Sequence, residues 1–174
     1  MNAFNNTRQP RPVMKLKLRV FDIILEMAGW LLLLAGWFIP LWEYNRLPQR
    51  IPVHFNWSGQ ADSMGEKWMI WIIPSIATIL FSGLTLLNRY PQIFNYPVRI
   101  TEQNAYRQYT LATRLIRYLK TIVVFIFEFI SLQVIKSAEG KSAGIPRWFL
   151  PVVLILVFIP LIYDVIRSLS NHGK

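Results

Sequence analysis

One stretch of the chain limits its possible folds more than any other feature: residues 68–88 contain no charged side chain. A helix needs about 20 apolar residues to cross a hydrocarbon core of roughly 30 Å, and these 21 residues suffice. The composition agrees, because 53% of the chain is hydrophobic and only 16% is charged. A soluble domain carries about 25% charged residues. The sequence therefore predicts an integral membrane protein.

Three further segments, at residues 23–42, 121–135 and 148–166, are apolar except for one acid each: Glu26, Glu128 and Asp164. We expect a transmembrane helix from each, so the predicted fold class is an all-α integral membrane protein with a four-transmembrane-helix bundle. The remaining segments are an N-terminal tail (1–22), a loop after the first helix (43–67), a basic linker with an interfacial helix (89–120), a third loop (136–147) and a C-terminal tail (167–174). We expect the first apolar run to be retained, because it is too long for the core of a cleaved signal peptide.

Lysine and arginine are distributed unevenly over the two sides of such a bundle. The two tails and the 89–120 linker carry 13 of them, and the other two loops carry 6. By the positive-inside rule, both termini face the cytoplasm and the 43–67 loop faces outward. We therefore expect a multi-pass protein of the cell inner (cytoplasmic) membrane. No nucleic acid partner is expected, because the basic residues flank apolar runs rather than gathering on one polar domain.

The residue types exclude several kinds of chemistry. The chain has no cysteine, so disulfides, thiol nucleophiles and thiolate zinc sites are ruled out. Histidine occurs at only two positions, His54 and His172, which lie in segments predicted on opposite sides of the membrane. We expect a protein that is not an enzyme, with no catalytic centre and no cofactor.

A helix is predicted to begin in the basic linker, with Thr101 as its N-cap. Arg107, Arg114 and Arg117 then follow at spacings of seven and three residues, which places them on one helical face. Arginine at this depth suits lipid phosphates in the headgroup layer. The alternative is a docking surface for a cytoplasmic partner.

Several residues of the 43–67 loop predict its local structure. Pro48 and Pro52 keep its entry extended and forbid a helix, and residues 53–57 alternate well enough for a short strand. Ser58-Gly59 predicts a turn, and Asp62 with Gly65 three positions later is the pattern of a type I turn. We expect a small ordered cap over the helix ends, with a hairpin as one form of it.

The loop also carries the pattern LPxxIPxHFxxxGxxDxxGxK, followed at once by a Trp-rich apolar helix. The matching residues are Leu47, Pro48, Ile51, Pro52, His54, Phe55, Gly59, Asp62, Gly65 and Lys67. This pattern resembles the bacterial membrane family of domain of unknown function 1648, the N-terminal module of SdpI-like immunity proteins, over roughly residues 23–120. The resemblance implies an immunity or envelope-stress protein whose outer loop meets a toxin or envelope ligand.

His54 raises the question of a metal site, because imidazole and carboxylate ligands suit zinc or manganese. Asp62, Glu66 and Glu43 are the acids within the same loop. Zinc sites usually recruit more than one nitrogen or sulfur ligand, so we expect no metal and instead a hydrogen bond from His54 that folds the loop. Asn56, also in the motif loop, begins an Asn-Trp-Ser sequon, which we attribute to chance in a bacterial family.

Glu128 lies at the middle of the third predicted helix. A charge there costs roughly 2.5–3.5 kcal/mol on insertion scales, and such residues tend to face the bundle interior. The functional interpretation is a proton or cation relay or a polar anchor for a ligand. The structural interpretation is a protonated carboxyl that is hydrogen-bonded to Ser75, Thr78 or Ser82 of the second helix.

The first helix adds two smaller predictions. Asp22 and Glu26 lie at its start, where the helix dipole favours acids, and Arg19 is close enough for a local ion pair with Asp22. Ala28-Gly29 and Ala35-Gly36 give the helix a small-residue face. Such a face serves close helix packing, within the bundle or in a homodimer.

Two functions from different classes follow from these observations. The first is a non-enzymatic binding and protection protein that resembles the immunity family, with the outer loop as its recognition element. The second is a small transporter, or an accessory subunit of a membrane transport complex, with Glu128 as its functional acid. In the second case a membrane partner subunit is expected, and in both cases the lipid bilayer surrounds the helices.

Overall fold

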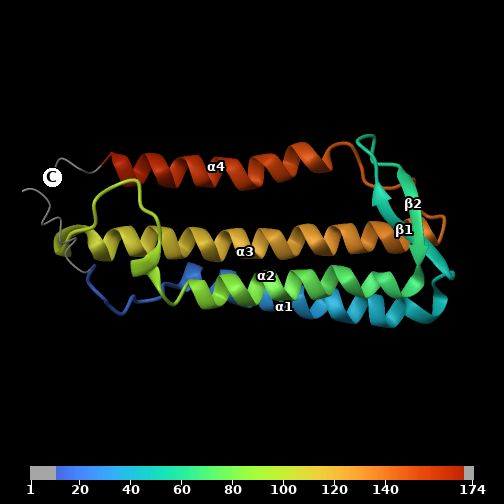
Figure 1. Cartoon of the computed structure of the whole chain (residues 1–174), viewed down its shortest axis with the longest axis horizontal. Coiled ribbons are helices and arrows are strands. Elements are labelled where there is room, and N and C mark those ends of the chain that lie inside the picture. Colours follow the sequence, from blue (N-terminus) through green and yellow to red (C-terminus); the bar gives the residue numbers. More distant parts are fainter. Residues whose placement is uncertain (1–10, 171–174) are drawn as a thin grey trace, which may run out of the picture.

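A computed structural model describes residues 11–170 of the chain. Four long helices and one two-stranded hairpin make up the fold (Figure 1). In chain order the elements are α1 (Val20–Glu43), the 3-10 turn η1 (Tyr44–Arg46), β1 (Arg50–Phe55), β2 (Ala61–Glu66), η2 (Lys67–Trp71), α2 (Ile72–Leu87), η3 (Pro91–Ile93), α3 (Glu102–Ala138) and α4 (Phe149–Leu169). All four helices are long and apolar enough to cross a membrane, when η2 is counted with α2. The predicted fold class is confirmed.

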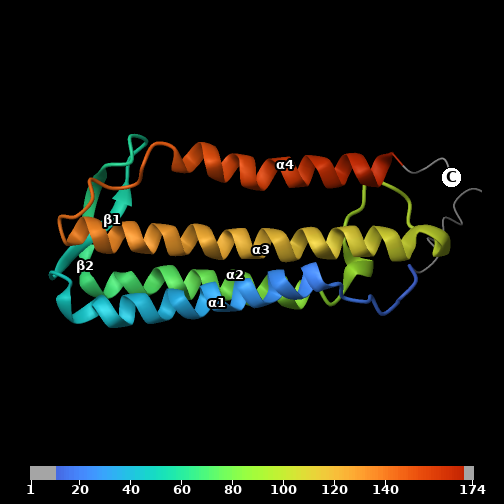
Figure 2. The ribbon, with the colours of Figure 1, turned by 180° about the vertical axis from the view of Figure 1, so that it is seen from behind.

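The bundle is built around α3. Helices α1 and α2 lie along one side of it and α4 along the other (Figures 1 and 2). The hairpin lies at one end, together with the link between α3 and α4, and we call this the hairpin end. The opposite end holds the start of α1 and the segment between α2 and α3, and we call it the terminal end.

Helix α3 is a single helix of 37 residues, so the interfacial helix and the third span predicted from the sequence are continuous. Thr101 caps it as predicted: its hydroxyl accepts from the backbone N–H of Asn104, and the Asn104 side chain accepts from the N–H of Thr101. At 1.5 Å per residue the helix is about 55 Å long. That length exceeds a hydrocarbon core of about 30 Å, so part of α3 extends beyond the apolar layer.

Two groups of buried apolar side chains hold the bundle together. One lies at the hairpin end and joins Leu47 and Ile51 to α2 and α3. The other lies deeper in the bundle and consists of Leu33, Ala77, Phe81 and Val124. The outward faces are apolar as well; in α4 only Phe149 and Ser168 are buried. Such faces require lipid rather than water around them.

The hairpin differs from its prediction in one respect. Strands β1 and β2 pair antiparallel, with Arg50 opposite Glu66 and Phe55 opposite Ala61. Residues 62–65, predicted as a type I turn, are part of β2, so that prediction is wrong. Gly65 occurs here for a reason other than a turn, since it leaves room for its neighbours in the hairpin. A Cβ at this position would lie 2.6 Å from Val53 and 2.5 Å from the Met69 sulfur. The turn predicted at Ser58-Gly59 is present.

Candidate functional site

The tip of the hairpin is an ordered turn that presents one large aromatic side chain. The Asn56 side-chain oxygen accepts hydrogen bonds from the backbone N–H groups of Ser58 (2.9 Å) and Gln60 (3.1 Å). Gly59 completes the turn with a φ of +80°, a conformation that glycine adopts without strain. Trp57 lies between these residues and is 99% exposed. The sequence motif thus shapes a tip whose most prominent group is an indole ring.

A backbone bridge fixes this tip to the link between α3 and α4. The N–H of Ile145 donates to the carbonyl of Gly59 at 2.8 Å, and Gln60 pairs with Gly144. A Cβ at Gly59 would collide with the carbonyl oxygen of Ile145. Gly59 is therefore needed both for the turn and for this close approach. No local pattern in the sequence signals Gly144 and Ile145 as its partners.

His54 and Asp62 face each other across the two strands. The His54 Nδ1 lies 2.5 Å from the Asp62 Oδ1, and both side chains are substantially exposed, at 67% and 41%. The other two acids considered as metal ligands have different partners: Glu66 accepts from the Trp68 indole N–H at 2.8 Å, and Glu43 pairs with Arg46. Within residues 11–170 no three histidine or acidic side chains come close enough to hold a metal ion.

The remaining motif residues hold the hairpin against the end of the bundle. Pro52 is buried within β1, whereas Pro48 is exposed just before it. Phe55 packs at the edge of the hairpin-end core. The Lys67 ammonium lies 4.5 Å from the centre of the Tyr44 ring and 3.5 Å from the carbonyl oxygen of Leu47. The motif thus encodes how the hairpin folds and where it lies.

Glu128 is buried in the bundle, but its neighbour is α1. Its carboxyl lies directly against Gly36, at the place where a Cβ would stand. The hydroxyls of Ser75 and Thr78 instead donate to carbonyls of their own helix at 2.7 Å, and Ser82 is exposed. The placement of Glu128 toward the bundle interior therefore agrees with the sequence, whereas the α2 hydroxyls are not its partners.

Gly36 is distinctive for a second reason. Pro40 lies inside α1 and has no N–H, so it cannot donate to the carbonyl of Gly36 four residues earlier. The carbonyl of Gly36, the residue against which the Glu128 carboxyl packs, therefore lacks its helical donor. A protonated carboxyl has one O–H to donate.

A network of charges that includes the buried Asp22 and Lys120 joins α1 to α3 near the terminal end. Asp22 pairs with Arg114 through two contacts of 2.9 and 3.2 Å. Glu26 pairs with Arg117 at 3.2 Å and with Lys120 at 2.7 Å. Lys120 is fully buried and also donates to Thr85 of α2 at 2.8 Å.

These pairs correct two expectations. Arg114 and Arg117 turn toward α1 rather than forming a continuous basic face with Arg107, whose guanidinium donates to the carbonyl of Arg167 at 3.3 Å. Arg19 contacts Asp22 through its backbone: its N–H donates to the Asp22 carboxylate and its carbonyl accepts from the Asp22 N–H, both at 2.9 Å. The predicted local ion pair is replaced by the pair with Arg114. Asp22 and Glu26 of α1 pair with basic residues of α3 because a carboxylate removed from water requires a partner of opposite charge.

Lys120 is the buried functional candidate that sequence analysis missed. Its signal was present in the helical spacing, since it follows Arg117 by three residues and so lies near it on α3. The acids of α1 recur at a spacing of four. Matching the two patterns required knowing that α1 and α3 lie side by side.

The comparisons with known proteins fit this geometry. Residues 31–78 match the model of a family described as domain of unknown function (DUF1648), a segment that includes the hairpin, the second half of α1 and the start of α2. An uncharacterised protein of Archaeoglobus fulgidus is 25% identical over 137 residues, which cover 72% of this chain and 75% of the relative. No solved structure matches the chain. Residues 31–78 of this membrane protein belong to the DUF1648 family.

Proposed function

We propose that this protein is a non-enzymatic inner-membrane protein that recognises a toxin or envelope-stress ligand through its hairpin, as the resemblance to SdpI-like immunity proteins implies. The observation that carries the proposal is Trp57, whose side chain is 99% exposed at the tip of an ordered hairpin. A fully exposed indole adds nothing to the stability of the fold. Tryptophan is instead among the residues that dominate binding energy at protein interfaces.

The anchoring of the tip supports the same proposal. The His54–Asp62 contact joins the strands, and the Ile145–Gly59 hydrogen bond joins the tip to the α3–α4 link. A recognition element that is already ordered loses less conformational entropy when its ligand binds. The hairpin is therefore prepared for binding without a large rearrangement.

The outward side of the membrane is part of the proposal. The hairpin end belongs to the side that carries 6 of the 19 lysines and arginines, which the positive-inside rule assigns to the exterior. Trp57 would then be accessible to a ligand outside the cell.

The proposal is tested by survival in the source organism. A strain without the gene is challenged with culture supernatant of the parent strain and with a panel of membrane-active peptides, and then complemented. We expect the wild type to restore survival and Trp57→Ala to fail while it reaches the membrane in equal amount. Trp42→Ala is the matched control, because Trp42 is also exposed at the hairpin end, on α1. Full protection by Trp57→Ala would refute recognition through the tip.

A second candidate function rests on Glu128. Its burial against Gly36, in the middle of the bundle, favours a carboxyl that takes up and releases a proton in a small transporter or accessory subunit. The test is proton flux into liposomes that contain the purified protein. Coupled flux that disappears in Glu128→Gln, with folding unchanged, would support transport. Absence of flux in the wild type would reject transport by the chain alone.

A further inference from the structure

Two concave surfaces adjoin at the base of the hairpin, and they differ in chemistry. The first has a volume of about 860 Å³ and lies where β2 meets η2. Its polar lining consists of Gln49, Arg50, Lys67 and the Glu66 carboxylate, with Tyr44 and Trp68 beside them. Cations and interfacial aromatics together are the features of a headgroup layer.

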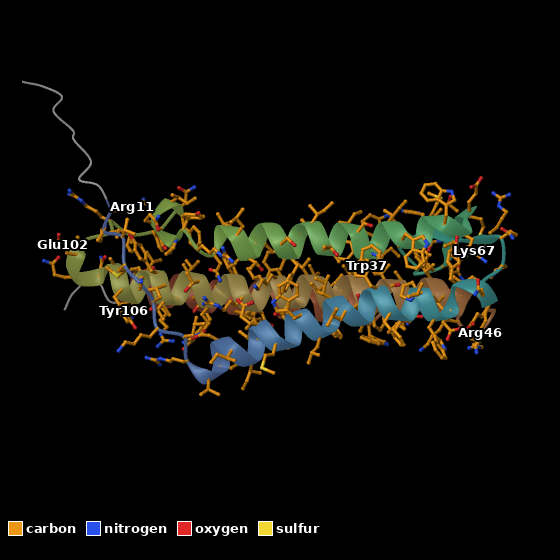
Figure 3. All side chains as sticks on the ribbon, turned by 90° about the horizontal axis from the view of Figure 1, so that it is seen from below. Arg11, Trp37, Arg46, Lys67, Glu102 and Tyr106 are labelled. Atoms are coloured by element: carbon orange, nitrogen blue, oxygen red, sulfur yellow. The ribbon has the colours of Figure 1, made fainter. Side chains whose placement is uncertain are left out.

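The second surface lies farther along the bundle, between α1 and the end of η2. It has a volume of about 480 Å³. Its lining is apolar and consists of Leu34, Trp37, Phe38, Leu41 and Trp71. Figure 3 shows Lys67 at the hairpin end and Trp37 nearer the middle of the bundle, between α1 and α2. The apolar surface therefore lies within the spans, where acyl chains are found.

A pair of aromatic rings connects the two surfaces. The Tyr44 ring, which borders the polar surface, lies 5.3 Å from the ring of Trp71 in the apolar one. Trp71 in turn stacks on Trp37 at 6.0 Å. The path from the cations to the apolar groove is continuous along these three side chains.

The two cations have positive charge available for a ligand. Arg50 donates to the carbonyl of Met64 at 3.2 Å, and Lys67 lies against the Leu47 carbonyl and the Tyr44 ring. Within residues 11–170 neither forms an ion pair with an acid. The Glu66 carboxylate, which lines the same surface, accepts a hydrogen bond from the Trp68 indole N–H at 2.8 Å instead.

We propose that these adjoining surfaces form one binding site for a phospholipid with an anionic headgroup. The headgroup phosphate contacts Arg50 and Lys67, and an acyl chain lies along the apolar groove between Trp37 and Trp71. The two positive charges favour an anionic headgroup. The apolar groove lies within the spans, so it favours an acyl chain. The site lies on a different part of the hairpin end from the Trp57 tip and does not depend on the proposed function.

The experiment uses tryptophan quenching by brominated lipids. The full chain is placed in phosphatidylcholine nanodiscs that contain a minor fraction of dibrominated phosphatidylglycerol or dibrominated phosphatidylcholine. We expect stronger quenching by the phosphatidylglycerol, with an affinity preference of about fivefold for each of the two charges. Equal quenching by the two lipids overturns the proposal, and this comparison requires only the wild type.

Matched variants locate the site. Arg50→Gln combined with Lys67→Gln should abolish the preference. Arg46→Gln should retain it, because Arg46 lies at the same end (Figure 3) but is paired with Glu43 and lines neither surface. Loss of the preference in Arg46→Gln to the same extent would show a general effect of surface charge and overturn the site.

The apolar half is tested separately. Trp37→Phe should lose most of the extra quenching by brominated phosphatidylglycerol, whereas Trp42→Phe should keep it. Inorganic phosphate serves as a competitor without a chain, and we expect it not to displace the lipid. Complete displacement by inorganic phosphate would show a simple anion site and overturn the assignment to a lipid.

Discussion

The hydroxyl of Tyr118 in α3 donates a hydrogen bond to the carbonyl oxygen of Leu156 in α4, at 3.0 Å. This carbonyl is special because the residue four positions later is Pro160, which lies inside α4 and has no N–H. Tyr118 therefore replaces a hydrogen bond that proline removes from the helix. In a span, an unpaired carbonyl is costly because lipid offers no donor.

Tyr118→Phe should destabilise the protein by about 0.6–2 kcal/mol, the range for interhelical hydrogen bonds in membranes. In a Pro160→Ala background the same change should cost much less, because the substituted alanine would supply the missing helical N–H. The measurement is unfolding by SDS titration in mixed micelles, as a double-mutant cycle. Tyr106→Phe, on an exposed part of α3, is the control and should have no effect. Additive effects of Tyr118→Phe and Pro160→Ala would contradict the replacement.

The buried charge network predicts a strong asymmetry between single and double changes. Glu26→Gln should cost about 3–5 kcal/mol, because it leaves the buried Lys120 ammonium without its carboxylate. Adding Lys120→Met should recover much of that loss. The free energy of unfolding checks both. Glu43→Gln should cost at most about 1 kcal/mol, because the cation that loses its partner is Arg46, which is 65% exposed, rather than a buried ammonium. Equal costs for Glu26→Gln and Glu43→Gln would contradict a buried network.

Membrane topology is tested by labelling, because the chain has no native cysteine. Ser58→Cys places a thiol at the exposed hairpin tip, and Ser170→Cys places one at the exposed terminal end. From the charge distribution we expect an impermeant maleimide to label Ser58→Cys in intact cells and Ser170→Cys only after lysis. The reverse pattern would place the hairpin in the cytoplasm and reject an external ligand.

The hairpin contact predicts a local effect without a global one. His54→Ala and Asp62→Ala each remove one side of the 2.5 Å contact, so proteolysis near Gly59 should accelerate while membrane insertion stays unchanged. Limited proteolysis followed by mass spectrometry measures this. Metal analysis of the purified wild type is the accompanying control, and stoichiometric metal lost in His54→Ala would assign His54 as a ligand instead.

The spans and the hairpin turn could be predicted from the sequence because their signals are local. Residues 68–88 lack charge, Thr101 offers a cap, and Ser58-Gly59 offers a turn. Residues 62–65 show the limit of local signals: their turn pattern was outweighed by pairing with β1, in which Gly65 is needed to leave room for Val53.

The candidate sites depended more on contacts between distant segments. That Glu128 would be buried followed from its position in an apolar run, but its contact with Gly36 required the packing of α1 on α3. Asp22 lies 92 positions from its partner in α3, and Glu26 lies 94 positions from Lys120. Single-sequence patterns carry no pairing information over such separations.

The contact between Gly36 and Glu128 makes the last prediction. A Cβ at Gly36 would occupy the position of the Glu128 carboxyl, so Gly36→Ala must displace a buried polar group. We expect a loss of about 1–3 kcal/mol in the free energy of unfolding. Glu128→Ala should relieve the clash in the Gly36→Ala background, whereas Glu128→Gln should not, because glutamine has nearly the same shape. On its own, Glu128→Gln should fold as well as the wild type.

Gly83 provides the matched control for this series, since it lies in α2 and a Cβ there would meet no atom within 4 Å. Gly83→Ala should leave stability unchanged or raise it by up to about 1 kcal/mol, because alanine loses less backbone entropy in a helix than glycine. If Gly36→Ala behaved like Gly83→Ala, the carboxyl would have room to move, and the close packing of α1 on Glu128 would be wrong. Even in that case, a folded Glu128→Gln variant that lost the protective or transport function would identify Glu128 as a functional acid. Glutamine has nearly the shape of glutamate but cannot release a proton.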